Sequence, residues 1–249
     1  MSDLPVSLLA IILITFFAAG AVKGVSGMGL PTLAMAVLGA ILSPVAAASL
    51  LIIPSFVTNI WQLVAGPSFG ATLRRLWPMM LSIVIATIFG VRLMTSTDTQ
   101  TATVALGMTL IFYSLYTLFG RQFTIRRSSE FWLSPVIGIA TGFVTGATGV
   151  FVIPAVPYLQ ALGLSRDDLV QALGLSFTVS TIALAASLGL QGAFRINALG
   201  LSLLAVIPAL AGMWVGQIVR SRISQDSFRR GFLVCLLLFG VEMSVRPLL

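Results

Sequence analysis

The stretch Gly20-Ala-Val-Lys-Gly-Val-Ser-Gly-Met-Gly-Leu-Pro31 has a counterpart in the second half, Gly142-Phe-Val-Thr-Gly-Ala-Thr-Gly-Val-Phe-Val-Ile-Pro154. In both copies three glycines follow one another at the same two intervals, and a hydroxyl residue precedes the third glycine. Glycine lacks a Cβ and proline lacks a backbone N–H, so both stretches are expected to interrupt helices and leave free backbone polar groups. Inside a bilayer, such paired breaks indicate a transporter's binding site.

Composition and hydropathy predict an integral membrane protein. Hydrophobic residues make up 58% of the 249 residues, charged residues 8%, and the mean hydropathy is +1.07, whereas soluble domains carry roughly 25% charged residues. Several uncharged runs each exceed the roughly 20 residues that span a bilayer. These runs are residues 24–73, 99–120, 131–165, 169–194 and 196–219. Because residues 1–5 carry no basic side chain, we expect a retained first helix and not a cleaved signal peptide.

The basic residues gather in short loops, although the net charge is +7. The positive-inside rule explains this excess, and nucleic-acid binding explains it poorly. The single cysteine, Cys235, and the absence of histidine exclude an internal disulfide and a conventional Cys/His metal site. We therefore expect no metal and no cofactor, and the expected partners are the lipid bilayer and a small anionic substrate.

Proline and glycine divide the apolar runs into helices, two of them short and placed after the glycine breaks. The first half is predicted to form helices at 4–25, 31–42, 44–64, 76–94 and 99–119. The second half is predicted to form them at 131–150, 154–162, 168–190, 197–219 and 231–245. The expected fold class is an all-α integral membrane protein with eight to ten membrane segments, depending on whether the short helices span or are re-entrant.

The two halves are predicted to be an internal duplication. Beyond the glycines they share a Leu-Gly pair and a later Ser-Phe pair in the same order. We assign repeat one to residues 1–120, a cytoplasmic linker to 121–130 and repeat two to 131–249. With the arginine-rich loops near 74–75, 121–127 and 220–230 in the cytoplasm, both termini lie outside and the repeats start on opposite sides, which is inverted topology.

The glycine breaks are expected to bind an anion. Helix N-termini present free N–H groups and the positive end of the dipole, and short helices starting near Pro31 and Pro154 would aim these at the glycine turns. In an inverted pair the two turns would meet near the midplane, in a cavity lined by donors. The predicted substrate-binding residues are Lys23, Gly24, Ser26, Gly27, Gly29, Asn59, Gln62, Thr145, Gly146, Thr148, Gly149 and Ser176.

Lys23 is the only lysine in the chain and lies one residue before the first break. An ammonium within a membrane helix is costly unless it faces a cavity or a partner, and the alternative is a side chain that snorkels to the interface. The polar residues that share one helical face are Ser55, Thr58, Asn59 and Gln62. Such a face is typical of cavity lining, although interhelical hydrogen bonding produces the same pattern. Gln171 is a further, weaker candidate.

The residues Lys23-Gly-Val-Ser-Gly-Met-Gly-Leu-Pro31 and Gly142-Phe-Val-Thr-Gly-Ala-Thr-Gly149, followed by Val152-Ile-Pro-Ala-Val-Pro157, resemble the TauE/SafE family of sulfite and organosulfonate exporters. The resemblance covers nearly the whole chain. It implies secondary transport of a sulfur-containing anion, such as sulfite, thiosulfate or an organosulfonate, across a bacterial inner membrane, most often outward. Many members carry longer glycine runs at both breaks, whereas only Gly149 precedes Val150 in the second break here. Alternating access around a midplane site follows from both the residues and the resemblance.

Other functions remain open at this point. An anion channel would use the same residues without an occluded state. A non-transporting structural subunit, including a homodimer, would use the Gly20/Gly24 and Gly142/Gly146 pairs only to pack helices. An enzyme would need a general base or metal ligands, which the central segments lack, so we expect none. Without histidine or a central carboxylate, the usual proton relay has no candidate, and the coupling ion stays open.

Overall fold

The protein is almost entirely helical. Its structure, a computed structural model, describes residues 5–120, 124–194, 198–220 and 222–246, and these form helices and no strand. The first half contains α1 (Val6–Ser26), α2 (Leu30–Ile41), α3 (Pro44–Val64), α4 (Phe69–Ser96) and α5 (Thr99–Phe119). The second half contains the 3-10 turn η1 (Arg127–Ser129), α6 (Glu130–Thr148), α7 (Ala155–Ala161), α8 (Arg166–Leu190), α9 (Ala198–Val219) and α10 (Gln225–Val245).

The predicted all-α class and the order of long and short helices are confirmed. Among the described residues, seven helices are long and apolar enough to cross a membrane, so the chain is a multi-pass membrane protein. The structure corrects the predicted starts of α4 and α10, since both helices begin several residues earlier, before their arginines. Arginine is a good helix former, and its long side chain reaches from a helix to the interface, so both helices continue through their basic residues.

The prolines of the first half play different roles. Pro44 starts α3, and Ser43 caps that helix by accepting a hydrogen bond from the backbone N–H of Ala46 at 3.2 Å. Pro31 lies in the first turn of α2. Pro54 lies inside α3 without ending it.

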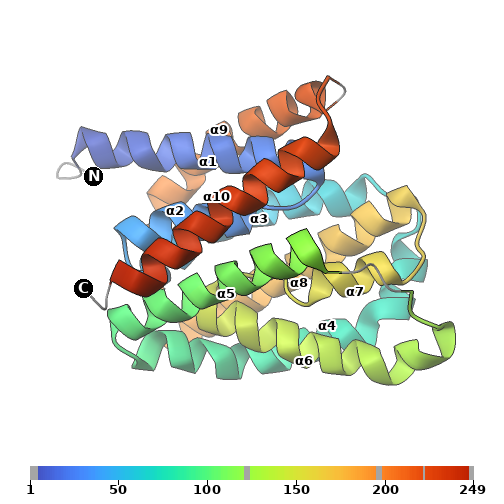
Figure 1. The fold of residues 1–249 in the computed structure, drawn as a ribbon. Helices are drawn as coiled ribbons and strands as arrows, with labels where there is room; N and C mark the ends of the chain where they lie inside the picture. The colour runs from blue at the N-terminus through green and yellow to red at the C-terminus, as the bar shows by residue number, and fades with distance from the viewer. Residues whose placement is uncertain (1–4, 121–123, 195–197, 221, 247–249) are drawn as a thin grey trace.

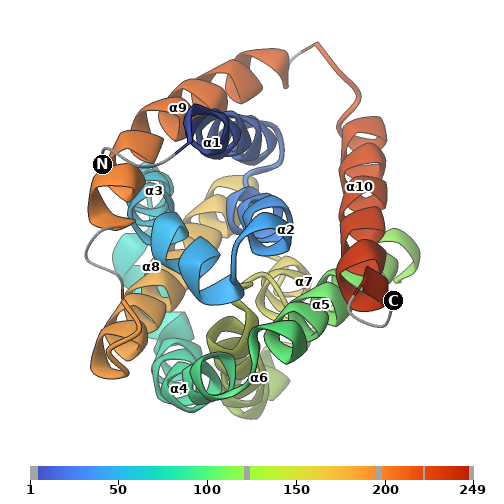
Figure 2. The same cartoon turned by 90° about the vertical axis from the view of Figure 1, so that its left-hand side faces the viewer.

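The helices pack in pairs that join the two halves of the chain. Viewed along the bundle, the α1–α9 pair and the α4–α6 pair lie on opposite sides, with α3 and α8 between them (Figure 2). α5 and α10 pack together on a third side, and the short α2 and α7 lie within the ring of long helices (Figure 2). Every one of these long pairs combines one helix from each half.

Glycines allow the α1–α9 and α4–α6 pairs to approach closely. A Cβ on Gly20 would lie 2.1 Å from the carbonyl oxygen of Ala209, and Gly24 is equally close to the backbone of α9. Gly142 and Gly146 meet the backbone of α4 in the same way. Small residues at such contacts let membrane helices pack through their backbones. The glycine pairs that a dimer could have used are therefore occupied within the chain.

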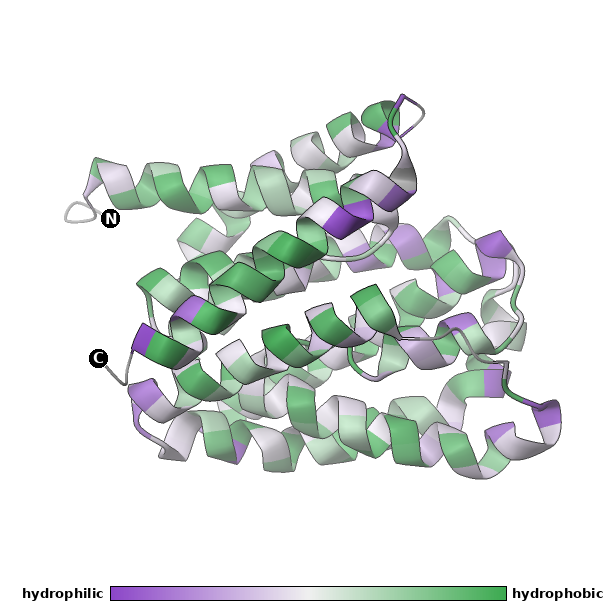
Figure 3. Ribbon diagram, viewed as in Figure 1, coloured by the Kyte–Doolittle hydropathy of each residue, from purple (hydrophilic) through white to green (hydrophobic). Residues whose placement is uncertain are grey.

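Basic side chains gather at one end of the bundle. Figure 1 shows the starts of α4, α6, α8 and α10 at the same end, and the start of α1 and the end of α10 at the opposite end. The arginines near these four starts are Arg74, Arg75, Arg126, Arg127, Arg166, Arg222, Arg229 and Arg230. Figure 3 shows hydrophobic residues along the middle of the helices and hydrophilic ones near their ends. We call the end of the bundle at which α4, α6, α8 and α10 start the arginine-rich end.

Candidate functional site

Lys23 points into the bundle and not toward the interface. Its side chain, near the end of α1, is only 3% exposed. The Nζ atom donates hydrogen bonds to Thr58 Oγ1, at 3.1 Å, and to Asn59 Oδ1. Both partners belong to α3, so the ammonium connects the first and third helices. The snorkelling alternative is excluded by this burial.

The hydrogen bonds continue from α3 to α8. Asn59 Nδ2 donates to Thr181 Oγ1 at 3.2 Å, and Thr181 lies near the middle of α8. The hydroxyl hydrogens of both threonines are already used, since Thr58 donates to Pro54 O at 2.8 Å and Thr181 donates to Phe177 O at 2.7 Å. Their oxygens therefore act as hydrogen-bond acceptors, that of Thr58 for Lys23 and that of Thr181 for Asn59. We call Lys23, Thr58, Asn59 and Thr181 the Lys23 cluster.

The Lys23 cluster holds a basic residue without an acidic partner. The ion pairs among the described residues are Arg75–Glu130 and Arg246–Glu242, and neither involves Lys23. Removing an ammonium from water costs several kcal/mol, which neutral hydrogen-bond acceptors offset only in part. Ionisable residues in such places within membrane proteins mark ion or substrate pathways. The geometry therefore suits a site for a small anion.

The first glycine break lies one helical turn beyond Lys23. Gly27 ends α1 with φ +77° and Gly29 precedes α2 with φ +106°, conformations that side chains rarely adopt. Gln62 Nε2 donates to the carbonyl oxygen of Gly27 at 2.9 Å, which ties the break to α3 one turn after Asn59. The hydroxyl of Ser26 folds back on the turn and donates to Met28 O at 2.6 Å. Gln62 Oε1 is buried and has no partner among the described residues.

A cavity of about 490 Å³ reaches this break from the arginine-rich end. At its inner side it is lined by Ser26 and Met28 of the break and by Val156 of α7. Its rim carries exposed residues of the arginine-rich end, including Arg229, whose guanidinium donates to Thr117 O at 3.1 Å. The other lining residues come from the ends of α1 and α5, from the segment after α5, from α7 and from the starts of α8 and α10.

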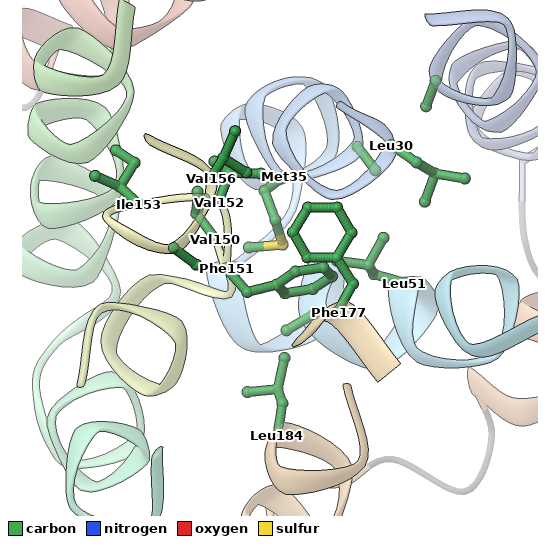
Figure 4. Close-up of a cluster of buried hydrophobic side chains, with 14 of the residues drawn as sticks. Leu30, Met35, Leu51, Val150, Phe151, Val152, Ile153, Val156, Phe177 and Leu184 are labelled. Carbon is green, nitrogen blue, oxygen red and sulfur yellow. The ribbon is translucent and has the colours of Figure 1, made fainter. Parts of the chain in front are cut away.

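The second break is enclosed by apolar side chains. Gly149 ends α6 with φ +73°, and a Cβ there would lie 3.0 Å from the sulfur of Met35. Residues 150–153 are buried beside α2 and α8, and the rings of Phe151 and Phe177 have their centroids 5.3 Å apart (Figure 4). Figure 4 shows the Met35 side chain extending toward these two rings. Apolar packing thus occupies the place where we expected donors from both breaks to meet.

The remaining residues that were predicted to bind substrate differ in what they contact. Thr145 and Thr148 donate to carbonyls of their own helix at 2.7 Å, and no hydrogen bond between described residues joins them to the Lys23 cluster. Ser176 is fully buried, and its hydroxyl has no partner in the described part of the chain. Gly24 and Gly146 lie at the helix contacts described above. Gln171 holds the turn after α3 by donating to Leu63 O and Gly66 O, so it is structural.

Sequence reasoning missed the cavity lining from α5 and α10. Tyr113, Tyr116 and Phe232 belong to segments that read as plain lipid-facing helices, and Arg229 was assigned only to a basic loop. Tyr113 and Tyr116 lie three positions apart on one face of α5, but membrane helices commonly carry tyrosines at the interface. No local sequence signal distinguishes a tyrosine that lines a cavity from one that lies at the membrane interface.

Comparison with known families identifies one match, which covers residues 12–243 and is described as sulfite exporter TauE/SafE. Searches of curated proteins and of solved structures gave no match. The matched segment includes the Lys23 cluster, both glycine breaks and the cavity.

Proposed function

This chain belongs to the TauE/SafE family of sulfite exporters, and we propose that it is a secondary transporter of a small sulfur-containing anion such as sulfite, thiosulfate or an organosulfonate. The anion binds between the Lys23 cluster and the first glycine break. Alternating access moves the anion across a bacterial inner membrane. The family is one of transporters and not of enzymes, which agrees with the chemistry of the buried residues.

The observation that carries this proposal is the buried ammonium of Lys23 with neutral partners only. A bound anion would supply the missing opposite charge. Backbone N–H groups at the start of α2 would donate to its oxygens, because the first turn of a helix leaves such groups without an intrahelical partner, whereas the Ser26 hydroxyl already donates within the turn. The second break is left out of this site, because apolar side chains surround it in the present conformation.

The helix pairing supports the inverted repeat. If α1 to α5 correspond to α6 to α10, then the α1–α9 pair corresponds to α6–α4, and α3–α9 corresponds to α8–α4. The α3–α8 and α5–α10 pairs each correspond to themselves. All of these pairs are found in the bundle. A two-fold axis between two inverted halves has this effect, and such halves are the usual basis of alternating access.

The proposed orientation follows from the positions of the arginines. The arginine-rich end is cytoplasmic by the positive-inside rule, and the start of α1 and the end of α10 are on the outside. The cavity then takes its anion from the cytoplasm, as an exporter requires. The apolar cluster around Phe151 and Phe177 favours a carrier over an open channel, because a permanent pore would need a continuous polar path.

Uptake by proteoliposomes tests this proposal. Labelled sulfite, thiosulfate, sulfate, methanesulfonate and chloride are compared for saturable uptake by the wild type and by Lys23→Gln. Loss of a hydrogen bond to a charged group costs roughly 1.5–3 kcal/mol, so uptake at low substrate should fall by about tenfold to a hundredfold. Arg92→Gln is the matched control, since it removes an exposed arginine that stacks on Phe89 of α4.

The outcomes separate the candidate functions. Saturable uptake of a sulfur anion that Lys23→Gln weakens and Arg92→Gln leaves unchanged supports the carrier and its site. Uptake that both variants leave unchanged keeps the carrier and removes Lys23 from the path. Absence of uptake for every anion rejects transport and favours a structural membrane subunit.

A further inference from the structure

We propose that Lys23 is the proton carrier of the transport cycle, taking up one proton together with one monovalent anion and releasing both on the other side of the membrane. This inference rests on the transport function proposed above and adds the coupled ion to it. Three features of the molecule support it: the count of hydrogen bonds at Nζ, the charges around Lys23, and the choice of lysine at this position.

The hydrogen bonds at Nζ leave room for one more acceptor when Lys23 is protonated. Lys23 has two acceptors, Thr58 Oγ1 and Asn59 Oδ1, and these take two of its N–H bonds in either protonation state. A protonated –NH3⁺ group has three. The third N–H has no acceptor among the described residues. An oxygen of a bound anion would accept it, so the anion and the proton favour each other's presence.

The helices around Lys23 offer no charge that would hold it permanently protonated. α1 packs against α2, α9 and α10, and Lys23 contacts α3, which is linked to α8. No ionisable residue occurs in α2, α3 or α9. The ionisable residues of α8 and α10 are Arg166, Asp167, Asp168, Asp226, Arg229, Arg230, Cys235 and Glu242. Those of α8 lie in its first turn, and no described carboxylate forms an ion pair with Lys23.

Lysine at this position can do what arginine cannot. The other basic residues of the chain are thirteen arginines, and none of those described is buried. Guanidinium keeps its proton in proteins, whereas a buried lysine ammonium can release it. The basic residue in the core is therefore of the type that can alternate between charged and neutral forms.

The resulting cycle moves no net charge through the apolar core. With anion and proton bound, the ammonium and the monovalent anion neutralise each other. On the receiving side the anion leaves, the N–H bond of –NH3⁺ breaks, and the proton passes to water while its electron pair stays on Nζ as –NH2. The empty carrier then returns uncharged. Ser26, one turn from Lys23, lines the cavity through which the proton enters from the arginine-rich side.

Proton movement with methanesulfonate tests the inference on the wild type. Methanesulfonate stays a monovalent anion at every pH used, so it cannot itself carry the proton. An inward methanesulfonate gradient should acidify the lumen of proteoliposomes, as reported by trapped pyranine, at a rate that a membrane potential set with valinomycin does not change. A gradient of about one pH unit, acid outside, should drive about tenfold accumulation, because one unit is a tenfold ratio of proton activity.

Variants at Lys23 give an independent readout. Lys23→Arg keeps the positive charge and cannot release it, so exchange of labelled for unlabelled methanesulfonate should persist while proton-driven accumulation disappears. Arg92→Gln should retain both activities. If Lys23→Arg does not fold, the wild-type measurement decides alone.

Several results would overturn the inference. They are methanesulfonate uptake without lumen acidification, uptake that follows the membrane potential, proton-driven accumulation by Lys23→Arg, or uptake of sulfite but not of methanesulfonate. Each of these leaves the proposed transport function intact. Absence of uptake for every anion rejects the transport function itself, and the proton coupling with it.

Discussion

Two basic residues of this protein, Lys23 and Arg75, have opposite surroundings. Arg75 lies near the arginine-rich end and forms a two-point ion pair with Glu130, with distances of 2.8 and 2.6 Å. Lys23 lies deeper in the bundle and has neutral partners, Thr58 and Asn59. A structural ion pair satisfies its own charges, whereas the charge of Lys23 needs a further partner. This difference is the reason for proposing that Arg75 stabilises the fold and that Lys23 binds the anion.

Asn59→Leu tests the Lys23 cluster at the level of one side chain. The change leaves a buried N–H of Lys23 without its acceptor, which should lower the free energy of unfolding by roughly 1–3 kcal/mol. Thermal unfolding in detergent measures the loss. The double variant Lys23→Met, Asn59→Leu should recover much of it, because no buried N–H is then left without its acceptor. Equal losses in the single and double variants would show that Asn59 acts through packing alone.

Gly20→Ala tests the backbone contact between α1 and α9. The added Cβ would lie 2.1 Å from Ala209 O, so the helices must separate. Overpacking of this kind costs roughly 1–3 kcal/mol. The matched control is Gly189→Ala in α8, where no atom lies within 4 Å of the new Cβ. The expected result is a lower unfolding temperature for Gly20→Ala and an unchanged or higher one for Gly189→Ala, where alanine is the better helix former.

At the scale of elements, the short helix α7 is held firmly at one end. Arg75 Nη2 donates to Leu162 O at 3.2 Å, directly after α7, and Ile125 N donates to Ala161 O at 2.9 Å. The hydroxyls of Tyr158 and Ser134 share a hydrogen bond that joins α7 to α6. The other end of α7 borders the apolar cluster around Phe151. The ion pair of Arg75 therefore positions one wall of the cavity.

Glu130→Gln tests how far this ion pair holds α7. The Glu130 side chain is only 12% exposed, so losing its charge should lower the free energy of unfolding by about 1–3 kcal/mol. Glu242→Gln is the control, because Glu242 is 47% exposed and lies 3.5 Å from Arg246. An exposed pair of that kind contributes about 0–1 kcal/mol. If both variants unfold at the wild-type temperature, α7 is held by packing and not by the ion pair.

At the scale of the whole molecule, the cavity and the apolar cluster lie at different breaks. The cavity reaches the first break, and the apolar cluster surrounds the second. The cavity connects Ser26 with the arginine-rich end. Phe151, Phe177 and Met35 pack beside the second break (Figure 4). A smaller cavity near Thr97 lies between the ends of α4 and α8 at the opposite end. A carrier in this conformation should expose its first break on one side of the membrane only.

Cysteine labelling tests that asymmetry. In a Cys235→Ser background, which removes the exposed native cysteine, Ser26→Cys should react with a membrane-impermeant thiol reagent from the arginine-rich side. Thr97→Cys should react from the opposite side, and Phe177→Cys should stay unlabelled because that side chain is fully buried. Vesicles of the two orientations provide the comparison. Reaction of Ser26→Cys and Thr97→Cys from the same side would contradict the proposed orientation.

Much of this architecture could be predicted from local sequence. The length of the apolar runs, the prolines and the glycines predicted the number, order and type of the helices, because helix formation depends mainly on neighbouring residues. The starts of α4 and α10 were less accurate, since basic residues can extend a membrane helix beyond its apolar part. For the candidate site, helical spacing predicted that Asn59 and Gln62 share one face of a helix, and the cost of a buried charge predicted that Lys23 faces a cavity or a partner.

The sequence by itself determined that this is a helical membrane protein with two glycine breaks and one lysine at the first of them. Only the tertiary structure decided that Lys23 faces Asn59, that Gly24 and Gly146 serve helix packing, and that apolar side chains fill the region of the second break. The physical reason is the distance along the chain over which sequence preferences act. Hydropathy and backbone preferences act over a few residues, whereas the Lys23 cluster, which joins α1, α3 and α8, depends on which faces meet across the bundle.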